Sequence, residues 1–182
     1  DEHRHRFKSL RVAKPLLPDE RVYTVIKEEL SADLSRYELE GTGVALIGHG
    51  TPDEDCSRIY REAAQRFASL FHPSLKVAFS NVEFSAPYCR DVLGELVMSG
   101  ISTLLVQPFM VVDGVHIHDD IRGAFEGTQT ENKLYRYLQE RYNGPFTQRL
   151  KEISFIYKPG LGAYRGIVEL FADHTVKALL QR

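Results

Sequence analysis

Three residues in this sequence are of types that bind metal ions or transfer protons: His49, Glu83 and His116. Each of them follows a short apolar run. Two imidazoles and one carboxylate are a suitable ligand set for a divalent transition metal such as cobalt, iron, nickel or zinc. The same groups suit general acid–base catalysis, because histidine titrates near neutral pH. The residue types alone therefore leave both kinds of chemistry open.

The neighbours of these residues favour a functional role over a packing role. His49 lies between Gly48 and Gly50, and we expect the two glycines to let the backbone approach a ligand closely. Glu83 lies between apolar residues, where a carboxylate is rarely buried unless it is paired or bound. No complete Gly-x-Gly-x-x-Gly or Gly-Lys-Ser/Thr motif follows Gly50, so phosphate binding ranks low. For His118, two residues after His116, a surface role and a ligand role are both open.

The elements that must position these residues alternate between strands and helices. The helix between Glu20 and Leu34 shows apolar residues at helical spacing, whereas the strands are nearly continuous apolar runs. The expected strands are 44–47, 75–79, 101–107 and 153–157, and the other expected helices are 51–71, 85–100, 134–142 and 164–180. This pattern predicts an α/β fold with a parallel sheet of about four strands and helices on both faces. The carboxyl ends of such strands share one edge, where ligands bind. The pattern leaves the strand order open.

Two local signals concern how segments begin and end. Thr51-Pro52-Asp53-Glu54 reads as a helix start, with Thr51 as the cap and Glu54 completing a capping box. The tripeptide 143–145, Asn-Gly-Pro, reads as a loop.

The beginning of the chain resembles its end. A short strand is expected at residues 10–13, and Lys14-Pro15 matches Lys158-Pro159 ahead of a helix in each case. We interpret residues 1–41 as the terminal strand and helix of a preceding, similar unit, and residues 42–182 as one complete domain. Chance similarity of two strand–turn–helix pieces is the alternative.

Composition excludes several classes of protein. The chain has 182 residues, 43% hydrophobic and 26% charged, which is enough for a sizeable core. Its formal net charge of −2 argues against nucleic acid as a partner. No apolar run approaches the roughly 20 residues that span a membrane. Cys56 and Cys89 lack metal-ligand spacing and fit a reducing, cytoplasmic location. Because the chain starts with Asp1, we expect a processed or excised piece.

Several motifs together resemble a known family. They are VALIGHGT at 44–51, Val82-Glu83, QPFMVVDGVHIHDD at 107–120, the Gly-Leu-Gly turn at 160–162 and KPLL at 14–17. They are similar to motifs of the class II chelatases, the sirohydrochlorin cobaltochelatase and ferrochelatase family. Val115 and Ala163 stand where that family often has acidic residues.

The resemblance implies two chelatase-like α/β halves that face each other across a cleft. The tetrapyrrole binds in the cleft, and His49, Glu83 and His116 form the metal site and the catalytic set. The second half would come from a missing N-terminal domain or from a homodimer partner.

The implied reaction is insertion of a divalent metal into sirohydrochlorin or a similar tetrapyrrole, in cobalamin or sirohaem synthesis. Cobalt is the expected metal substrate, with iron or nickel as alternatives, and no nucleotide is used. Arg58, Arg90 and Arg122 are expected to bind substrate carboxylates, which arginine can do bidentately. Lys158 and Arg165 are further candidates for that role. Two alternatives stay open: a non-catalytic domain that binds metal or tetrapyrrole, and a non-haem iron oxygenase.

Overall fold

The sheet at the centre of the molecule is parallel, as predicted. The computed structural model describes residues 10–112, 114, 116–126 and 131–180, and it describes only the backbone of His116. Within these residues, four parallel strands pair in the order β2-β1-β3-β4. The strands are β1 (Thr42–Gly48), β2 (Lys76–Asn81), β3 (Thr103–Pro108) and β4 (Ser154–Tyr157).

Helices connect these strands and flank the sheet. The longer helices are α1 (Glu20–Leu34), α2 (Glu54–Ser69), α3 (Cys89–Met98), α5 (Lys133–Tyr142) and α7 (Arg165–Leu180). The shorter ones are η2 (Leu39–Gly41), η3 (His116–Arg122), α4 (Gly123–Glu126), α6 (Gly144–Leu150) and η5 (Leu161–Ala163). None of the helices in the described part is long and apolar enough to span a membrane.

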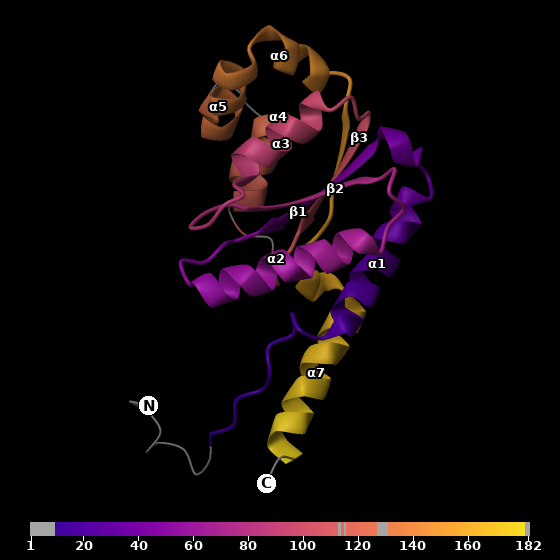
Figure 1. Cartoon of the computed structure of the whole chain (residues 1–182), viewed down its shortest axis with the longest axis vertical. Coiled ribbons are helices and arrows are strands. Elements are labelled where there is room, and N and C mark those ends of the chain that lie inside the picture. The colour runs from indigo at the N-terminus through magenta and orange to yellow at the C-terminus, as the bar shows by residue number, and fades with distance from the viewer. Residues whose placement is uncertain (1–9, 113, 115, 127–130, 181–182) are drawn as a thin grey trace.

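Both faces of the sheet are covered. Ala45 and Ile47 of β1 point to a core formed with α3, α4, α5, α6 and η3, and these helices lie above the sheet in Figure 1. Val44 and Leu46 point to a second core formed with α1, α2 and α7, which lie below the sheet in the same view. Every residue of β1 is buried, which explains why its sequence is a continuous apolar run rather than an alternating one.

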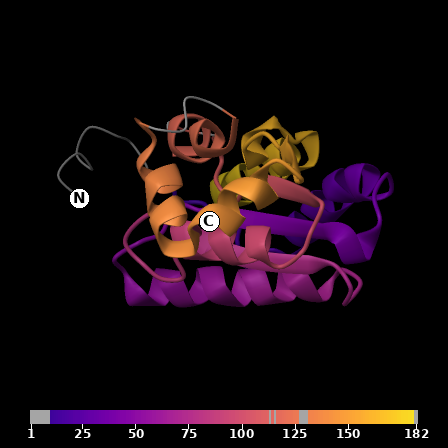
Figure 2. The same ribbon diagram turned by 90° about the horizontal axis from the view of Figure 1, so that it is seen from above.

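Strand β1 lies inside the sheet, between β2 and β3. Helix α2, which follows β1, contacts β2 and runs along one side of the molecule when it is seen from above (Figure 2). The central place of β1 matters for the site, because the loop after β1 has a loop from a neighbouring strand on each side.

The start of α2 differs from the prediction. The helix begins at Glu54, and its cap is Asp53, whose side chain accepts a hydrogen bond from the Cys56 N–H at 2.8 Å. Thr51 supports this turn from outside the helix, since its hydroxyl oxygen accepts a hydrogen bond from the Asp53 N–H. Aspartate is as good a cap as threonine, and here it lies closer to the first helical turn.

Two other local predictions are wrong. Residues 10–13 form no strand: Leu10 and Val12 are exposed, and a strand needs a neighbour for its backbone hydrogen bonds. The expected loop at 143–145 is instead the start of α6. Asn143 has a positive φ of 55° that separates α5 from α6, and Pro145 lies in the first turn of the new helix, where proline is tolerated.

Helix α1 is held against α7 by a polar cluster as well as by apolar packing. Arg21 binds both Asp19 and Asp173, and the His174 ring nitrogens lie 2.9 Å from the Lys14 carbonyl and from the Asp19 carboxylate. Hydrogen bonds from Arg21 and His174 hold the pKa of Asp19 well below its usual value. Hydrogen bonds to the Lys14 carbonyl and to Asp19 raise the pKa of His174. His174 is therefore a structural residue.

The division of the chain into a terminal piece of one unit, residues 1–41, and a complete domain, residues 42–182, stays a prediction.

Candidate functional site

The strand order brings the predicted residues to neighbouring loops. His49 directly follows β1, Glu83 follows β2 by two residues, and His116 begins η3 after β3. Because β1 pairs with both β2 and β3 in parallel, all three loops leave the same edge of the sheet. The topology therefore places His49 between the other two segments.

Backbone hydrogen bonds join His49 directly to the Glu83 segment. Parallel pairing continues past the ends of the strands: the Val82 N–H donates to the Gly48 carbonyl at 2.9 Å, and the Glu83 N–H donates to the His49 carbonyl at 3.0 Å. The side chains of His49 and Glu83 are both exposed to solvent. The structure thus places His49 and Glu83 on adjacent loops that are bonded through the backbone, with both side chains accessible to solvent.

Gly50 makes this close approach possible. Its φ is +90°, and a Cβ atom built on it would lie only 1.9 Å from the Glu83 carbonyl oxygen. No side chain fits there, and the left-handed region itself favours glycine. We expected Gly50 to admit a ligand; in the structure it admits the backbone of the neighbouring loop.

Asn81 anchors the loop that carries Glu83, and sequence reasoning missed this role. The residue is buried, its side-chain amide donates to the Ser85 carbonyl at 3.0 Å, and its backbone N–H donates to the Pro87 carbonyl at 2.8 Å. The loop is therefore fixed at both ends. The available signal was the asparagine at the end of this strand.

The segment that begins at His116 is anchored by its apolar residues. Ile117 and Ile121, one helical turn apart, are buried in the core, and the Asn132 side chain donates to the carbonyls of Asp119 and Asp120 at 2.9 Å each. The backbone of His116 belongs to η3. Its side chain lies outside the described residues, so its predicted role as a ligand is not tested. His118 is exposed.

A buried polar network connects the end of β3 to the residues that follow β4. The Tyr164 hydroxyl donates to the side-chain carbonyl of Gln107 at 2.6 Å, and the Gln107 amide donates to the carbonyls of Pro108 and Pro159. Burial raises the pKa of Tyr164, so it remains a neutral donor. Sequence reasoning missed this network too, although a glutamine inside an apolar strand was its signal.

The Gly-Leu-Gly turn, residues 160–162, supports the loop that precedes η3. The Leu161 and Gly162 N–H groups donate to the Met110 and Val111 carbonyls at 2.8 Å each. A Cβ on Gly162 would lie 2.8 Å from the Val111 carbonyl oxygen. The turn therefore needs glycine in order to pack against this loop.

The predicted substrate-binding arginines are exposed: Arg58 and Arg90 lie near the starts of α2 and α3, and Arg122 ends η3. Arg58 pairs with Glu62 at 3.0 Å, and Arg122 pairs with Glu126 at 2.8 Å. Arg90 lies over the Tyr88 and Tyr137 rings, at 4.9 and 5.3 Å from their centroids. Exposed ion pairs of this kind contribute little to stability, so these side chains can exchange partners. Their role in substrate binding stays a prediction.

Lys158, a further candidate for binding substrate carboxylates, is already paired with another residue. Its ammonium group pairs with Asp33 of α1 at 2.6 Å, and both side chains are largely buried. Arg165, in contrast, is an exposed residue paired with Glu169 on its own helix.

The two cysteines contribute no thiolate to this edge. Both are free, and burial raises the pKa of the Cys89 thiol to about 11. Cys56 is exposed, and its hydrogen bond to the Asp53 carboxylate raises its pKa. Neither is a ready metal ligand at neutral pH, since the thiolate is the ligand form.

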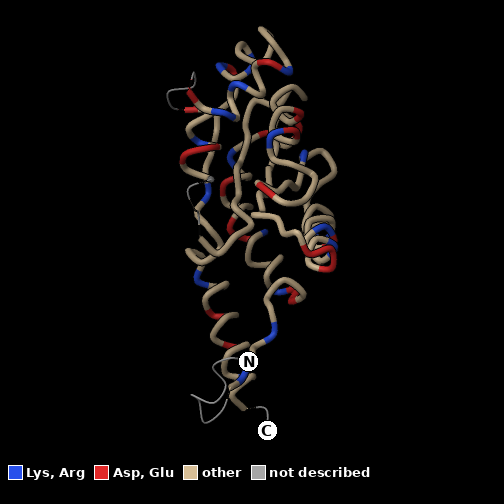
Figure 3. The backbone as a smooth tube through the Cα atoms, turned by 90° about the vertical axis from the view of Figure 1, so that its left-hand side faces the viewer, with Lys and Arg blue, Asp and Glu red and all other residues tan. Residues whose placement is uncertain are grey.

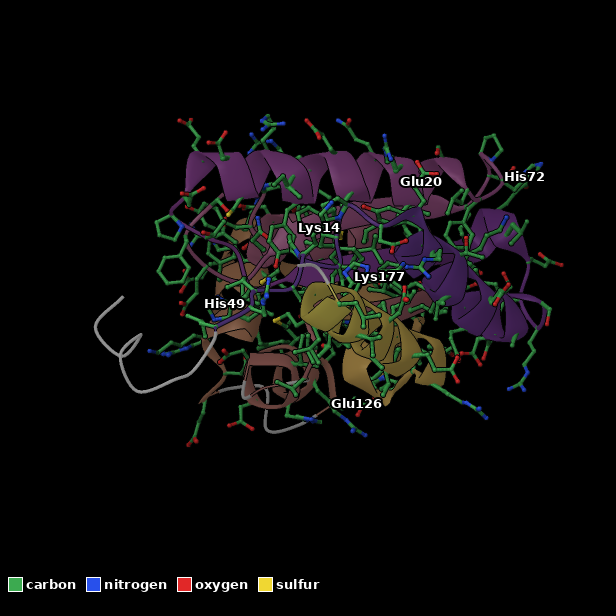
Figure 4. All side chains as sticks on the ribbon, turned by 90° about the horizontal axis from the view of Figure 1, so that it is seen from below. Lys14, Glu20, His49, His72, Glu126 and Lys177 are labelled. Atoms are coloured by element: carbon green, nitrogen blue, oxygen red, sulfur yellow. The ribbon has the colours of Figure 1, made fainter. Side chains whose placement is uncertain are left out.

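The predicted site residues lie on a side of the molecule where basic and acidic residues are mixed along the backbone. Figure 4 places His49 at the opposite end of α2 from His72, and Figure 3, drawn from the side on which His49 lies, shows basic and acidic residues interspersed. A cavity of about 450 Å³ lies between the segment before α1 and the end of α7, and it is lined by none of the predicted site residues. Among the described side chains, no group of three metal-ligating residues was found. The predicted trio includes His116, whose side chain lies outside the described residues.

Known proteins are similar to this chain in sequence and in fold. The model of the CbiX family matches residues 43–178. The sirohydrochlorin cobaltochelatase of Saccharolobus solfataricus is 29% identical over 99 residues, which are 53% of this chain and 72% of the relative. The sirohydrochlorin cobaltochelatase of Methanococcoides burtonii is 21% identical over 140 residues, which are 77% of this chain and 98% of the relative.

A solved structure extends the similarity to nearly the whole chain. SirB from Bacillus subtilis with Fe3+ superimposes with a TM-score of 0.65 at 18% sequence identity. The match covers 98% of this chain and 62% of SirB, so the chain spans less than two thirds of that protein's length. Because the sequence identity is this low, the superposition shows a shared fold and nothing more. The resemblance to the class II chelatases is confirmed by the family model, whose match covers most of the chain: the chain belongs to the CbiX family.

Proposed function

We propose that this chain inserts a divalent metal ion into sirohydrochlorin or a similar tetrapyrrole without nucleotide hydrolysis. Cobalt is the expected metal, with iron or nickel as alternatives, and the product would serve cobalamin or sirohaem synthesis. The observation that carries the proposal is the adjacency of His49 and Glu83, joined through the backbone at 3.0 Å in a chain of the CbiX family. Two relatives named sirohydrochlorin cobaltochelatase support the choice of metal and ring.

The chemistry requires removal of two protons from pyrrole nitrogens as the metal enters. A neutral imidazole of His49 or His116 can bring the metal and accept one proton, since imidazole is both a common metal ligand and a proton acceptor. The Glu83 carboxylate completes the metal site or accepts the second proton. Proton-transfer groups of this kind typically contribute about 10²–10⁴-fold each in rate.

A second wall is expected over this edge of the sheet. Apolar side chains are exposed in the loops after β2 and β3: Phe84 at 56%, Val111 at 51% and Val112 at 70%. A second chelatase-like half, from a preceding domain or from another copy of the chain, would cover them and enclose the macrocycle. This part of the proposal rests on the family resemblance and on the exposure of these residues.

Absorption spectroscopy tests the function directly. Purified protein mixed with sirohydrochlorin and Co²⁺ is expected to form the metallated ring faster than the same mixture without protein, and His116→Ala is expected to lose this acceleration. An acceleration that the variant retained in full would contradict the assignment of His116. Binding of the ring or the metal without any acceleration would favour the non-catalytic alternative. Oxygen consumption with added iron and a cosubstrate would indicate an oxygenase.

A further inference from the structure

The residue after Glu83 adopts a backbone conformation that a bulky side chain normally avoids. Phe84 has a φ of +62°, in a region that few non-glycine residues other than Asn and Asp enter. The Ser85 N–H donates to the Glu83 carbonyl at 2.7 Å, which closes a three-residue turn with Phe84 at its centre. A turn of this kind with positive φ is rare and strained.

The surrounding structure forces this conformation on the chain. On one side, Glu83 is bonded to the His49 carbonyl; on the other, Ser85 is held by the Asn81 side chain at 3.0 Å. Strained residues persist where such contacts over-determine them, and they cluster at ligand sites. A glycine would adopt the same φ without strain, so the phenyl ring itself needs an explanation.

Core packing does not supply that explanation. The side chain of Phe84 is 56% exposed, whereas the phenylalanines of the two cores are at most 7% exposed. The ring lies next to the imidazole of His49, with 5.7 Å between the centroids and 34° between the planes. The strained turn therefore places a half-exposed aromatic ring beside His49, in the loop that carries Glu83.

We propose that Phe84 is a positioning residue whose ring stacks on the face of the tetrapyrrole and sets its central nitrogens against His49 and Glu83. This inference rests on the function proposed above. An offset-stacked contact between flat π-systems is favourable beyond the area that it buries, and a turn fixed at both ends orders the ring before the substrate arrives, which lowers the entropic cost of binding. Ring placement would thus be built into the loop that carries Glu83.

Three substitutions separate ring stacking from a structural role. Phe84→Gly removes the ring and relieves the strain, Phe84→Leu keeps the strain and an apolar side chain, and Phe84→Tyr keeps an aromatic face. The readouts are the affinity for metal-free sirohydrochlorin, the KM for sirohydrochlorin, the affinity for Co²⁺ alone and the Tm. Phe171→Leu, which alters a 40%-exposed phenylalanine on α7, is the matched control.

Phe84→Gly is expected to bind sirohydrochlorin about ten-fold more weakly and to raise KM about ten-fold, with unchanged Co²⁺ affinity and an unchanged or higher Tm. Phe84→Leu is expected to weaken ring binding in the same direction, whereas Phe84→Tyr and Phe171→Leu are expected to behave as the original chain. Sirohydrochlorin affinity that is unchanged in Phe84→Gly would overturn the inference, as would a joint fall in Tm and Co²⁺ affinity.

The binding readout keeps this test separate from the test of catalysis. If the original chain binds the ring but inserts no metal, the proposed function fails, while the affinities of the Phe84 variants still decide whether the ring stacks. If the original chain does not bind sirohydrochlorin at all, both proposals are overturned.

Discussion

Replacing His49 with alanine is expected to slow metal insertion by at least about 100-fold, the lower end of the effect of removing one proton-transfer group. His49 is the most central of the three predicted ligands. Its carbonyl accepts a hydrogen bond from the Glu83 N–H, and it follows β1, which lies between β2 and β3. Losing its imidazole would remove a predicted metal ligand and a proton acceptor together. The measurement is the initial rate of cobalt insertion into sirohydrochlorin, with Tm followed in parallel.

His72→Ala is the matched control for this experiment. His72 is an exposed histidine beyond the far end of α2 from His49, so the same substitution there is expected to leave the insertion rate unchanged. An insertion rate in His49→Ala within a few-fold of the original, with the protein folded, would remove His49 from the catalytic set.

The second large effect is expected for Gly50→Ala. Alanine would have to adopt φ +90° and place its Cβ 1.9 Å from the Glu83 carbonyl oxygen, so the two loops must separate. The strain alone is expected to lower the free energy of unfolding by about 1–3 kcal/mol. Displacing Glu83 from His49 is expected to lower the insertion rate by about 10²-fold, the effect of a misplacement of roughly 1 Å. Chemical denaturation and the insertion assay measure the two effects.

Gly100→Ala separates backbone strain from the steric overlap. Gly100 has nearly the same φ, +86°, but nothing lies within 4 Å of its Cβ position. That variant is expected to lose about 1 kcal/mol of stability and to keep its insertion rate. Equal losses of activity in both variants would show that the contact between the His49 and Glu83 loops does not matter for function.

The fold was largely predictable because its signals are local. The continuous apolar run of β1 and the helical spacing in α1 each identify an element from neighbouring residues. The strand order was not predictable, since it depends on which distant strands pair. The strand expected at 10–13 is absent for the same reason. Leu10 and Val12 are of types common in strands, but a strand forms only beside a partner strand.

The sequence was enough to propose residues for the site, which stay a prediction, but it was not enough to give the geometry of their loops. Parallel strands made it possible to expect His49 and Glu83 at one edge without knowing that β1 and β2 are neighbours. The positive φ of Phe84 and the anchoring of its loop by Asn81 arise from contacts between segments. A phenylalanine next to a glutamate looks like ordinary apolar sequence, and only the backbone reveals the strain.

The central claim is that His49 and Glu83 hold one metal ion together with His116. Anomalous diffraction at the cobalt edge, from crystals of the chain soaked in Co²⁺, locates the metal directly. We predict one strong peak about 2.0–2.3 Å from a His49 ring nitrogen and a Glu83 carboxylate oxygen, with His116 as the third protein ligand. A fully occupied cobalt ion bound elsewhere, with no density between His49 and Glu83, would contradict the account.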